Sequence, residues 1–384
     1  MKRIILSLLL FLLPVTTVFA DEPKIAAQGA ALIDGRTGRL LWGKNADQTM
    51  SMASTTKIMT AILVLENTDL DEIVTVSRNA VCQPEVHMHL QEGEQWKVGD
   101  LLSAMMLRSY NDVAVALAEH VSGSVELFCD KMTEKAKEIG AEHTVFGSPN
   151  GLDSHLTDAE HHSTAYDMSL ITGYALQNET FREIIVQQET EIADLSGKHT
   201  CHVTNADRFL REYEGALGVK TGYTNKAGHC FVGAAEREDV LLISAVLGSG
   251  WGNSGKEQKW KDTKTLMDYG FANYHLYEII KAGMSFGEVK VSDSPVETVE
   301  TIPAEGYTAL FSEEERESLR MEVNLPENVE APVRKGEKLG IVSLFLGEEK
   351  LFETNLLAKA DIRTFSFSER LYRMAEIWLS WRML

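Results

Sequence analysis

The N-terminal part of the chain alternates between short hydrophobic runs and longer stretches with helical spacing. Residues 29–34 (GAALID) and 39–44 (RLLWGK) are apolar runs joined by a glycine-containing turn, and together they predict a β-hairpin. After Gly218, two further strand-like runs flank a tight polar turn, and DTKTLMDYGFANY beyond them has the spacing of a helix. Between these strand regions, apolar residues recur with a helical period in four stretches: 55–66, 98–120, 125–140 and a run that begins near residue 164.

Strands at both ends of this region therefore bracket a helical middle. One antiparallel sheet built from the N- and C-terminal strands, with helices packed on it, is the simplest way to bury these apolar faces. This pattern predicts an α+β domain over residues 21–274. From residue 275 the sequence becomes strand-like, charged and punctuated by Gly and Pro, which predicts a small β-rich domain over residues 275–363.

The final stretch, residues 364–384, has the pattern of an amphipathic helix, with Ser368 in the position of an N-cap. Two tryptophans beside a narrow polar stripe favour a helix that lies in a membrane interface. The alternative is a helix docked on the β-rich domain. On a helical projection, one stripe is polar and the opposite side is apolar. The polar stripe consists of Glu369, Arg373, Glu376 and Ser380. The apolar side consists of Leu371, Met374, Ala375, Trp378 and Leu379, with Trp381 at its edge.

The first residues have the features of a secretory signal peptide. Lys2 and Arg3 are followed by an apolar run over residues 4–13, and small residues close the segment. This run is short for a membrane-spanning helix, which needs about 20 residues, so an uncleaved anchor is the less favoured alternative. We therefore expect an exported protein whose signal peptide is residues 1–20 and whose mature chain begins near Asp21.

Charge and cysteine content narrow the classes of function. The 384-residue chain carries a formal charge of −20, and loss of Lys2 and Arg3 with the signal peptide makes it −22. Such an acidic protein repels nucleic acids, which argues against nucleic-acid binding. The cysteines are too sparse for a disulfide scaffold, and three pairings or free thiols stay open for Cys82, Cys129, Cys201 and Cys230.

The segment MASTTKIMT, residues 52–60, places Ser54 three residues before Lys57 at the start of a predicted helix. Residues three apart on a helix share a face, so the lysine amine can reach the serine hydroxyl. A serine hydroxyl becomes a nucleophile when a base removes its proton, and lysine is a base only when burial or a nearby cation keeps its amine neutral. On its own this pattern is common, and a serine that caps the helix explains it equally well.

Two further motifs follow along the chain. Residues 109–111 (Ser-Tyr-Asn) precede an apolar helical run, and residues 220–222 (Lys-Thr-Gly) lie just before the two C-terminal strands. Taken separately, the first matches a helix start and the second matches the edge of a strand, where lysine is common. Their order adds information, because Ser-x-x-Lys, Ser-x-Asn and Lys-Thr-Gly form the three-motif signature of penicillin-binding proteins and serine β-lactamases.

The surroundings of these motifs resemble one family, the D-alanyl-D-alanine carboxypeptidases, which are low-molecular-weight (class C) penicillin-binding proteins. The resemblance includes GRLLWGKNADQTMSMASTTKIMTAILVLE, SYNDVAVALAEHVSGS and GVKTGYTNKAGHCFVGAA, and it covers nearly the whole chain. It implies a catalytic domain of the β-lactamase/transpeptidase type, in which helices flank an antiparallel sheet. It also implies a serine peptidase, without a cofactor or metal, that removes the terminal D-alanine from peptidoglycan pentapeptide stems.

The resemblance assigns the chemistry to three side chains. Ser54 matches the serine that is acylated, Lys57 the general base that takes its proton, and Ser109 the hydroxyl that helps pass the proton to the leaving D-alanine nitrogen. Water then hydrolyses the ester. Tyr110 departs from the family, which often has glycine there, and its ring could narrow the site.

Five positions match residues with which the family binds substrate. Asn111 orients the substrate peptide, and Lys220 and Thr221 face its terminal carboxylate. Gly222 completes the Lys-Thr-Gly motif, and the backbone N–H of Tyr223 joins that of the nucleophile in an oxyanion hole. Tyr223 stands where the family commonly carries histidine or threonine.

Other functions compete with this one. A class A β-lactamase shares the three motifs but needs Glu-x-x-Leu-Asn after the second, and residues 111–220 do not contain it. A D,D-endopeptidase, or a wall-binding protein without turnover, would carry the same site. A zinc enzyme is disfavoured because no further correctly spaced ligand accompanies either of two groups: Cys82 with His87 and His89, and His199 with Cys201 and His202.

The expected partners follow from these arguments. They are peptidoglycan stem peptides as substrates, β-lactams as covalent inhibitors, and the outer face of the cytoplasmic membrane, which the C-terminal helix would contact. Nucleic acid is not among them.

Overall fold

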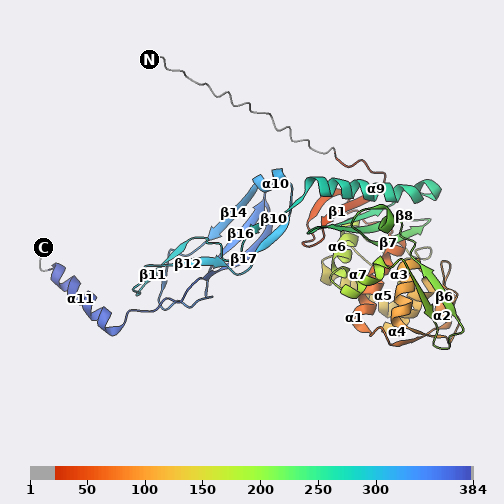
Figure 1. Ribbon diagram of the computed structural model, residues 1–384, viewed down its shortest axis with the longest axis horizontal. Coiled ribbons are helices and arrows are strands. Elements are labelled where there is room, and N and C mark those ends of the chain that lie inside the picture. The colour runs from red at the N-terminus through yellow and green to blue at the C-terminus, as the bar shows by residue number, and fades with distance from the viewer. Residues whose placement is uncertain (1–21, 382–384) are drawn as a thin grey trace, which may run out of the picture.

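The computed structural model describes residues 22–381, with side chains described through residue 379. The expected signal peptide, residues 1–20, and the side chains of Ser380 and Trp381 therefore lie outside the described residues. Figure 1 shows a first lobe of helices and strands, an elongated second lobe of strands, and helix α11 at the far end of the second lobe.

The first lobe is built on a five-stranded sheet in the order β2-β1-β9-β8-β7. Every neighbouring pair in it is antiparallel. The N-terminal hairpin pairs with β9, so strands from the two ends of this lobe meet in one sheet, as the sequence predicts. The strands are β1 (Gly29–Asp34), β2 (Leu40–Lys44), β7 (Ala216–Thr224), β8 (Gly228–Arg237) and β9 (Val240–Leu247).

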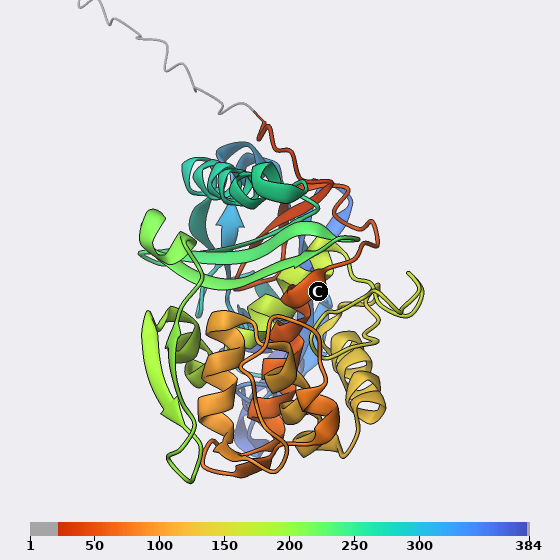
Figure 2. The ribbon, with the colours of Figure 1, turned by 90° about the vertical axis from the view of Figure 1, so that its right-hand side faces the viewer.

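Helices cover both faces of this sheet, which confirms the α+β class. Alternation along β1 sends Ala31 and Ile33 into a core shared with most of the helices, while Ala30 and Leu32 enter a second core under α9 (Gly252–Asn273). Figure 2 shows α9 on one side of the sheet and the helical bulk on the other. The helices of the larger core are α1 (Lys57–Asn67), α2 (Arg78–Val81), α3 (Val98–Arg108), α4 (Asn111–Ser122), α5 (Val125–Ile139), α6 (Ala165–Ala175) and α7 (Glu179–Val186).

The stretch 98–120, predicted as one helix, is two helices. α3 ends where Ser109 adopts a left-handed φ of 69°, and α4 begins two residues later. A helix cannot continue through a residue in this conformation. Apolar spacing runs on through the break, so the pattern shows no sign of it.

The helix predicted over 55–66 begins at Lys57, after a 3₁₀ turn, η1 (Ala53–Thr56), that contains Ser54. The expectation that Ser54 caps this helix is wrong, because no side chain caps α1. The turn brings the serine hydroxyl into contacts with other segments instead. Ser124 and Thr164, in contrast, cap α5 and α6 through their hydroxyls.

Small elements complete the first lobe. Two hairpins lie beside the helices, and one short helix precedes β7. Their bounds are β3 (Ile73–Thr75) with β4 (Gln95–Lys97), β5 (Glu189–Ala193) with β6 (Thr200–Thr204), and α8 (Phe209–Glu212).

The second lobe is rich in strands, as the sequence predicts. It holds a two-stranded sheet, β10 (His275–Ile280) with β13 (Tyr307–Phe311), and a six-stranded sheet in the order β14-β16-β17-β12-β11-β15. One short helix, α10 (Glu313–Glu317), follows β13. The remaining strands are β11 (Glu288–Ser292), β12 (Thr298–Pro303), β14 (Leu319–Asn324), β15 (Asn328–Glu330), β16 (Lys338–Leu346) and β17 (Glu349–Ala358).

One arginine ties the two lobes together. The Arg39 guanidinium forms two hydrogen bonds to the Glu315 carboxylate and another to the Leu310 carbonyl, and it lies 4.7 Å from the centre of the Phe311 ring. Beside it, the Asp34 carboxylate accepts the backbone N–H of Leu310 at 3.0 Å. The turn of the N-terminal hairpin is therefore fastened to the end of β13.

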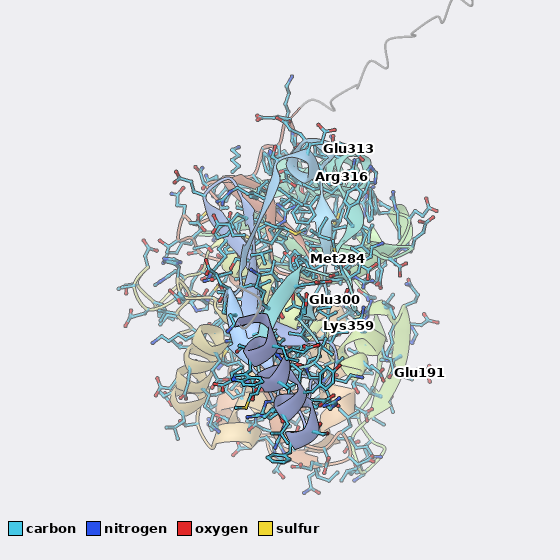
Figure 3. The ribbon with its side chains drawn as sticks, turned by 90° about the vertical axis from the view of Figure 1, so that its left-hand side faces the viewer. Glu191, Met284, Glu300, Glu313, Arg316 and Lys359 are labelled. Atoms are coloured by element: carbon cyan, nitrogen blue, oxygen red, sulfur yellow. The ribbon has the colours of Figure 1, made fainter. Side chains whose placement is uncertain are left out.

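Helix α11 (Phe367–Trp381) extends from the second lobe, and Figure 3 views the molecule from the end that carries it. Ser366 caps this helix, since its hydroxyl accepts the backbone N–H of Glu369; the expected cap, Ser368, lies inside the first turn. The apolar side chains of α11 are exposed, among them Leu371 and Trp378. None of the helices in the described part of the chain is both long enough and apolar enough to span a membrane.

Candidate active site

The candidate nucleophile and its base lie in a single turn. Ser54 is held in the 3₁₀ turn η1, and Lys57 is the first residue of α1. The Lys57 Nζ lies 2.9 Å from the Ser54 Oγ, so the expected reach of one side chain to the other is present. Ala53, just before the serine, has a φ of 49°, which bends the backbone into the turn.

Three acceptors surround the Lys57 amine, which is fully buried. Besides Ser54, it bonds to the Asn111 Oδ1 at 2.8 Å and to the Asn150 carbonyl at 2.7 Å. The Ser54 Oγ lies 3.2 Å from this same carbonyl, and its one hydrogen can point there or, when Lys57 is neutral, at the lone pair of the Lys57 amine. The Asn150 carbonyl therefore fixes both partners of the expected proton transfer.

Electrostatics favour the neutral form of this lysine. Burial lowers the pKa of Lys57 well below its ordinary value, the charge of Lys220 lowers it further, and Asp112 partly opposes both. A neutral amine beside a serine hydroxyl is the arrangement that general-base activation requires.

The Lys-Thr-Gly motif lies on β7, the edge strand of the sheet, against the nucleophile turn. Lys220 is buried, and its pKa is lowered to about 7 by burial and by the charge of Lys259, with Asp207 acting in the opposite direction. A Cβ on Gly222 would lie 2.9 Å from the Ser54 backbone nitrogen. Only glycine lets the strand approach the serine this closely.

The Ser-Tyr-Asn motif forms the turn between α3 and α4. Asn111 donates from Nδ2 to the Pro84 carbonyl at 3.1 Å and holds Lys57 with its oxygen. Ser109 is half-buried in this turn, and no hydrogen bond joins its hydroxyl to Ser54 or Lys57 in the described structure. The Tyr110 ring packs on the helical core, with its hydroxyl beside Cys201 and Arg108.

The remaining expected residues lie along the open edge of β7. Thr221 is half-buried, and Tyr223 is 44% exposed and packs on the His229 ring at 4.3 Å between centres. A groove of about 500 Å³ continues from Tyr223 between residues 152–156 and 224–226. The groove gives a bound peptide room beside the end of β7.

Sequence reasoning missed three contributors to this site. Asn150 acts through its backbone carbonyl, which has no side-chain signature. Lys259, on α9, is a third buried lysine, and its charge lowers the pKa of Lys220. His161 is fully buried behind the nucleophile turn. In the sequence, His161 stands in the polar segment HHST, residues 161–164, which does not single it out from its neighbours.

The His and Cys groups considered for zinc do not form a metal site in the described residues, where no three His, Cys, Asp or Glu side chains cluster to hold an ion. The rings of His87 and His89 contact each other at 4.3 Å, and His199 lies 2.9 Å from Glu94. All four cysteines are free thiols; Cys129 and Cys230 are buried, Cys82 is exposed and Cys201 is half-buried.

A serine and a buried lysine in one turn, with Asn111 and a lysine-bearing edge strand around them, define a serine acyl-transfer enzyme of the penicillin-recognising class. The chain belongs to the D-alanyl-D-alanine carboxypeptidases: the family described as "D-alanyl-D-alanine carboxypeptidase" (Peptidase S11) matches residues 16–250. A second family, "Penicillin-binding protein 5, C-terminal domain", matches residues 274–364.

Individual relatives agree with this assignment. The chain is 31% identical over 398 residues to the D-alanyl-D-alanine carboxypeptidase DacF of Bacillus subtilis, with 100% of both chains covered. It is 28% identical to DacC of Escherichia coli, over 95% of this chain and 92% of the relative. Penicillin-binding protein 5 from Haemophilus influenzae has a similar structure, with a TM-score of 0.74, 27% identity and coverage of 90% of this chain and 99% of that one.

The resemblance found in the sequence is therefore confirmed. The chain is a serine-type D-Ala-D-Ala carboxypeptidase, a hydrolase of the penicillin-binding protein family. This family acts on peptidoglycan stem peptides and binds β-lactams of the penicillin type.

Proposed function

We propose that this enzyme releases the terminal D-alanine of peptidoglycan pentapeptide stems through an acyl-enzyme on Ser54. One observation carries the proposal: the Ser54 Oγ lies 2.9 Å from the buried amine of Lys57. That distance allows direct proton transfer, and the lowered pKa of Lys57 supplies a neutral acceptor.

Acylation would proceed as follows. Lys57 takes the hydroxyl proton while the Ser54 oxygen attacks the carbonyl carbon of the penultimate D-alanine. The backbone N–H groups of Ser54 and Tyr223 stabilise the resulting oxyanion. The close approach of Gly222 to the serine nitrogen supports this placement of the carbonyl between the turn and β7.

The leaving D-alanine needs a proton on its nitrogen. Ser109 relays it from Lys57, and the position of this serine two residues before Asn111 supports the role. Lys220 and Thr221 hold the terminal carboxylate, which suits a cation that burial has already separated from water. Asn111 orients both the peptide and Lys57.

Water then attacks the ester, with Lys57 again as base, and the tetrapeptide stem leaves. A β-lactam follows the first half of this route, since its strained amide is attacked in the same way. Its ring opens without a departing fragment, so the acyl-enzyme persists.

The cellular placement of the enzyme is part of the proposal. The leader, residues 1–20, would be removed on export, leaving a catalytic domain over 21–274, a β-rich domain over 275–363 and the helix 364–384. The exposed apolar side chains of α11 support peripheral attachment to the outer face of the cytoplasmic membrane, because a membrane interface would remove this apolar surface from water.

The test is release of D-alanine from a pentapeptide stem by the purified enzyme, with the tetrapeptide as a control substrate. We expect one D-alanine per pentapeptide and none from the tetrapeptide. Lys57→Ala should lower the rate by about 1,000-fold, within the usual range for loss of a general base. Equal rates for Lys57→Ala and the parent enzyme would exclude the proposed base.

A further inference from the structure

A buried histidine outside all three motifs connects two segments of the active site. His161 is 0% exposed, and both of its ring nitrogens have partners. The backbone N–H of Gly147 donates to Nδ1 at 3.1 Å, and Nε2 lies 3.3 Å from the Thr56 Oγ1. Thr56 is the residue immediately before Lys57, so the ring touches the nucleophile turn directly.

The hydrogen-bond pattern fixes the proton on this ring. The Thr56 hydroxyl donates its only hydrogen to the Ala53 carbonyl at 2.7 Å, so it must accept from the Nε2–H of His161. Nδ1 accepts from Gly147 and therefore carries no hydrogen. Burial lowers the pKa of His161 to about 4, with smaller effects from Lys226 and His162, so the ring is neutral near pH 7.

His161 is hydrogen-bonded to the loop of residues 147–151, and this loop also contains the Asn150 carbonyl. This loop accepts hydrogen bonds at Asn150 from both Ser54 and Lys57, and at Pro149 from Thr60 at 2.6 Å. Its contact with the turn is close, since a Cβ on Gly151 would lie 2.0 Å from the Ala53 oxygen.

We propose that His161 is a positioning residue for acylation: it clamps the nucleophile turn to the 147–151 loop and so holds the Asn150 carbonyl against Lys57 and Ser54. His161 does not contact substrate in this role. The role rests on the proposed acylation of Ser54. No hydrogen bond joins His161 to Lys220 or Thr221 in the described residues, so we expect its loss to affect the chemical step rather than substrate binding.

Three substitutions separate the two hydrogen bonds of the ring. His161→Asn keeps an acceptor near Nδ1 for Gly147, His161→Gln keeps a donor near Nε2 for Thr56, and His161→Ala keeps neither. Thr144→Val is the matched control. The Thr144 hydroxyl is equally buried and bonds to Asp167 at 2.7 Å and Ser163 at 2.8 Å, but these partners do not touch Ser54 or Lys57.

The measurements are kcat and KM for D-alanine release, the rate of acylation by a fluorescent penicillin, and the melting temperature. We expect His161→Ala to lower kcat and the acylation rate about 100-fold, as a misplacement of about 1 Å can do, with KM within about two-fold of the parent value. His161→Asn and His161→Gln should recover roughly ten-fold of this loss by keeping one hydrogen bond. Thr144→Val should lower the melting temperature and leave kcat unchanged.

Two results would overturn the inference. One is a loss of kcat in Thr144→Val that matches the loss in His161→Ala at equal loss of melting temperature. The other is an unchanged rate of acylation by the fluorescent penicillin in the His161 variants. If His161→Ala does not fold, the Asn and Gln variants carry the test alone. Failure of the parent enzyme to acylate would instead refute the proposed function.

Discussion

Two buried lysines flank the catalytic serine, and the positive charge of one lowers the pKa of the other. Lys57 must be neutral to act as a base, whereas Lys220 must be charged to hold a carboxylate. Burial lowers the pKa of both side chains, and the charge of Lys220 lowers that of Lys57 further. The two requirements can be met together only within a limited range of pH.

We therefore expect a bell-shaped pH profile for acylation by a penicillin. The rate rises with pH as Lys57 loses its proton and falls as Lys220 loses its own, below the ordinary lysine value of 10.5. Lys220→Met removes a cation that lowers the pKa of Lys57, so the acid limb should move up by about 1 pH unit. Lys220→Arg keeps the charge and should keep the limb in place. An unchanged acid limb in Lys220→Met would contradict this coupling.

Gly151 offers a test of the packing behind the serine. It has a φ of 83°, and a Cβ there would lie 2.0 Å from the Ala53 oxygen, so Gly151→Ala must displace backbone next to the nucleophile. We expect a loss of roughly 3 kcal/mol in the free energy of unfolding and near-complete loss of acylation.

The control for this change is Gly197→Ala. Gly197 has a φ of 70° but no atom within 4 Å of the added carbon, so it isolates the cost of the backbone conformation. We expect this variant to lose about 1 kcal/mol of stability and no activity. Chemical denaturation and penicillin labelling measure the two effects, and equal losses in both variants would exclude a special role for Gly151.

The sequence predicts the reacting side chains of this site better than it predicts the residues that hold them in place. Ser54, Lys57 and Asn111 are recognisable because the chemistry demands those residue types at those spacings, and the structure joins them by hydrogen bonds. Asn150 is different, since any residue has a carbonyl. His161 forms a hydrogen bond with Thr56, which lies more than 100 positions away in the sequence, and no local sequence pattern predicts such a contact.

Among the elements, strands and helix interiors follow from hydrophobic period, while their ends depend on single backbone conformations. The break at Ser109 and the 3₁₀ turn around Ser54 are both absent from the pattern. Both irregularities fall in the active site. This is expected, because each aims a polar side chain in a direction that a continuous helix would not allow.

Helix α11 exposes much of its apolar surface to solvent. Among its described side chains, six large apolar ones and that of Tyr372 are more than half exposed; the six are Phe367, Leu371, Met374, Ile377, Trp378 and Leu379. We expect the full mature chain to pellet with lipid vesicles and a chain ending at Arg363 to stay in the supernatant, because the helix supplies the apolar surface. Both proteins should release D-alanine at equal rates. Equal partitioning of the two chains would rule out α11 as the attachment.

On the scale of the whole molecule, the two lobes are tied through Arg39 and Asp34. Arg39 lies 276 positions from its partner Glu315, and Asp34 lies 276 positions from its partner Leu310. The sequence predicts both lobes, but it does not predict contacts over such separations. Asp34 itself is the last residue of β1 and accepts the backbone N–H of Arg36, in the hairpin turn, at 2.9 Å. The same carboxylate thus shapes the turn and binds the second lobe.

Arg39→Ala should loosen this connection without altering the catalytic site. We expect a loss of about 2 kcal/mol from the charged hydrogen bonds, and a larger radius of gyration by small-angle scattering, with unchanged D-alanine release. Arg36→Ala is the control, since Arg36 lies in the same turn but pairs with the exposed Asp239 at 3.8 Å. A scattering curve that is identical for Arg39→Ala and the parent protein would show that other contacts hold the lobes.

The most direct test of the central claim is covalent labelling by a penicillin, read by mass spectrometry of the intact chain and of its peptides. We expect the parent enzyme to gain the mass of one opened β-lactam on the peptide that contains Ser54, and Ser54→Ala to gain none. Ser196→Ala, a serine on the remote turn between β5 and β6, should label like the parent. Labelling of Ser54→Ala, or a label on any other peptide of the parent enzyme, would contradict Ser54 as the acylated residue.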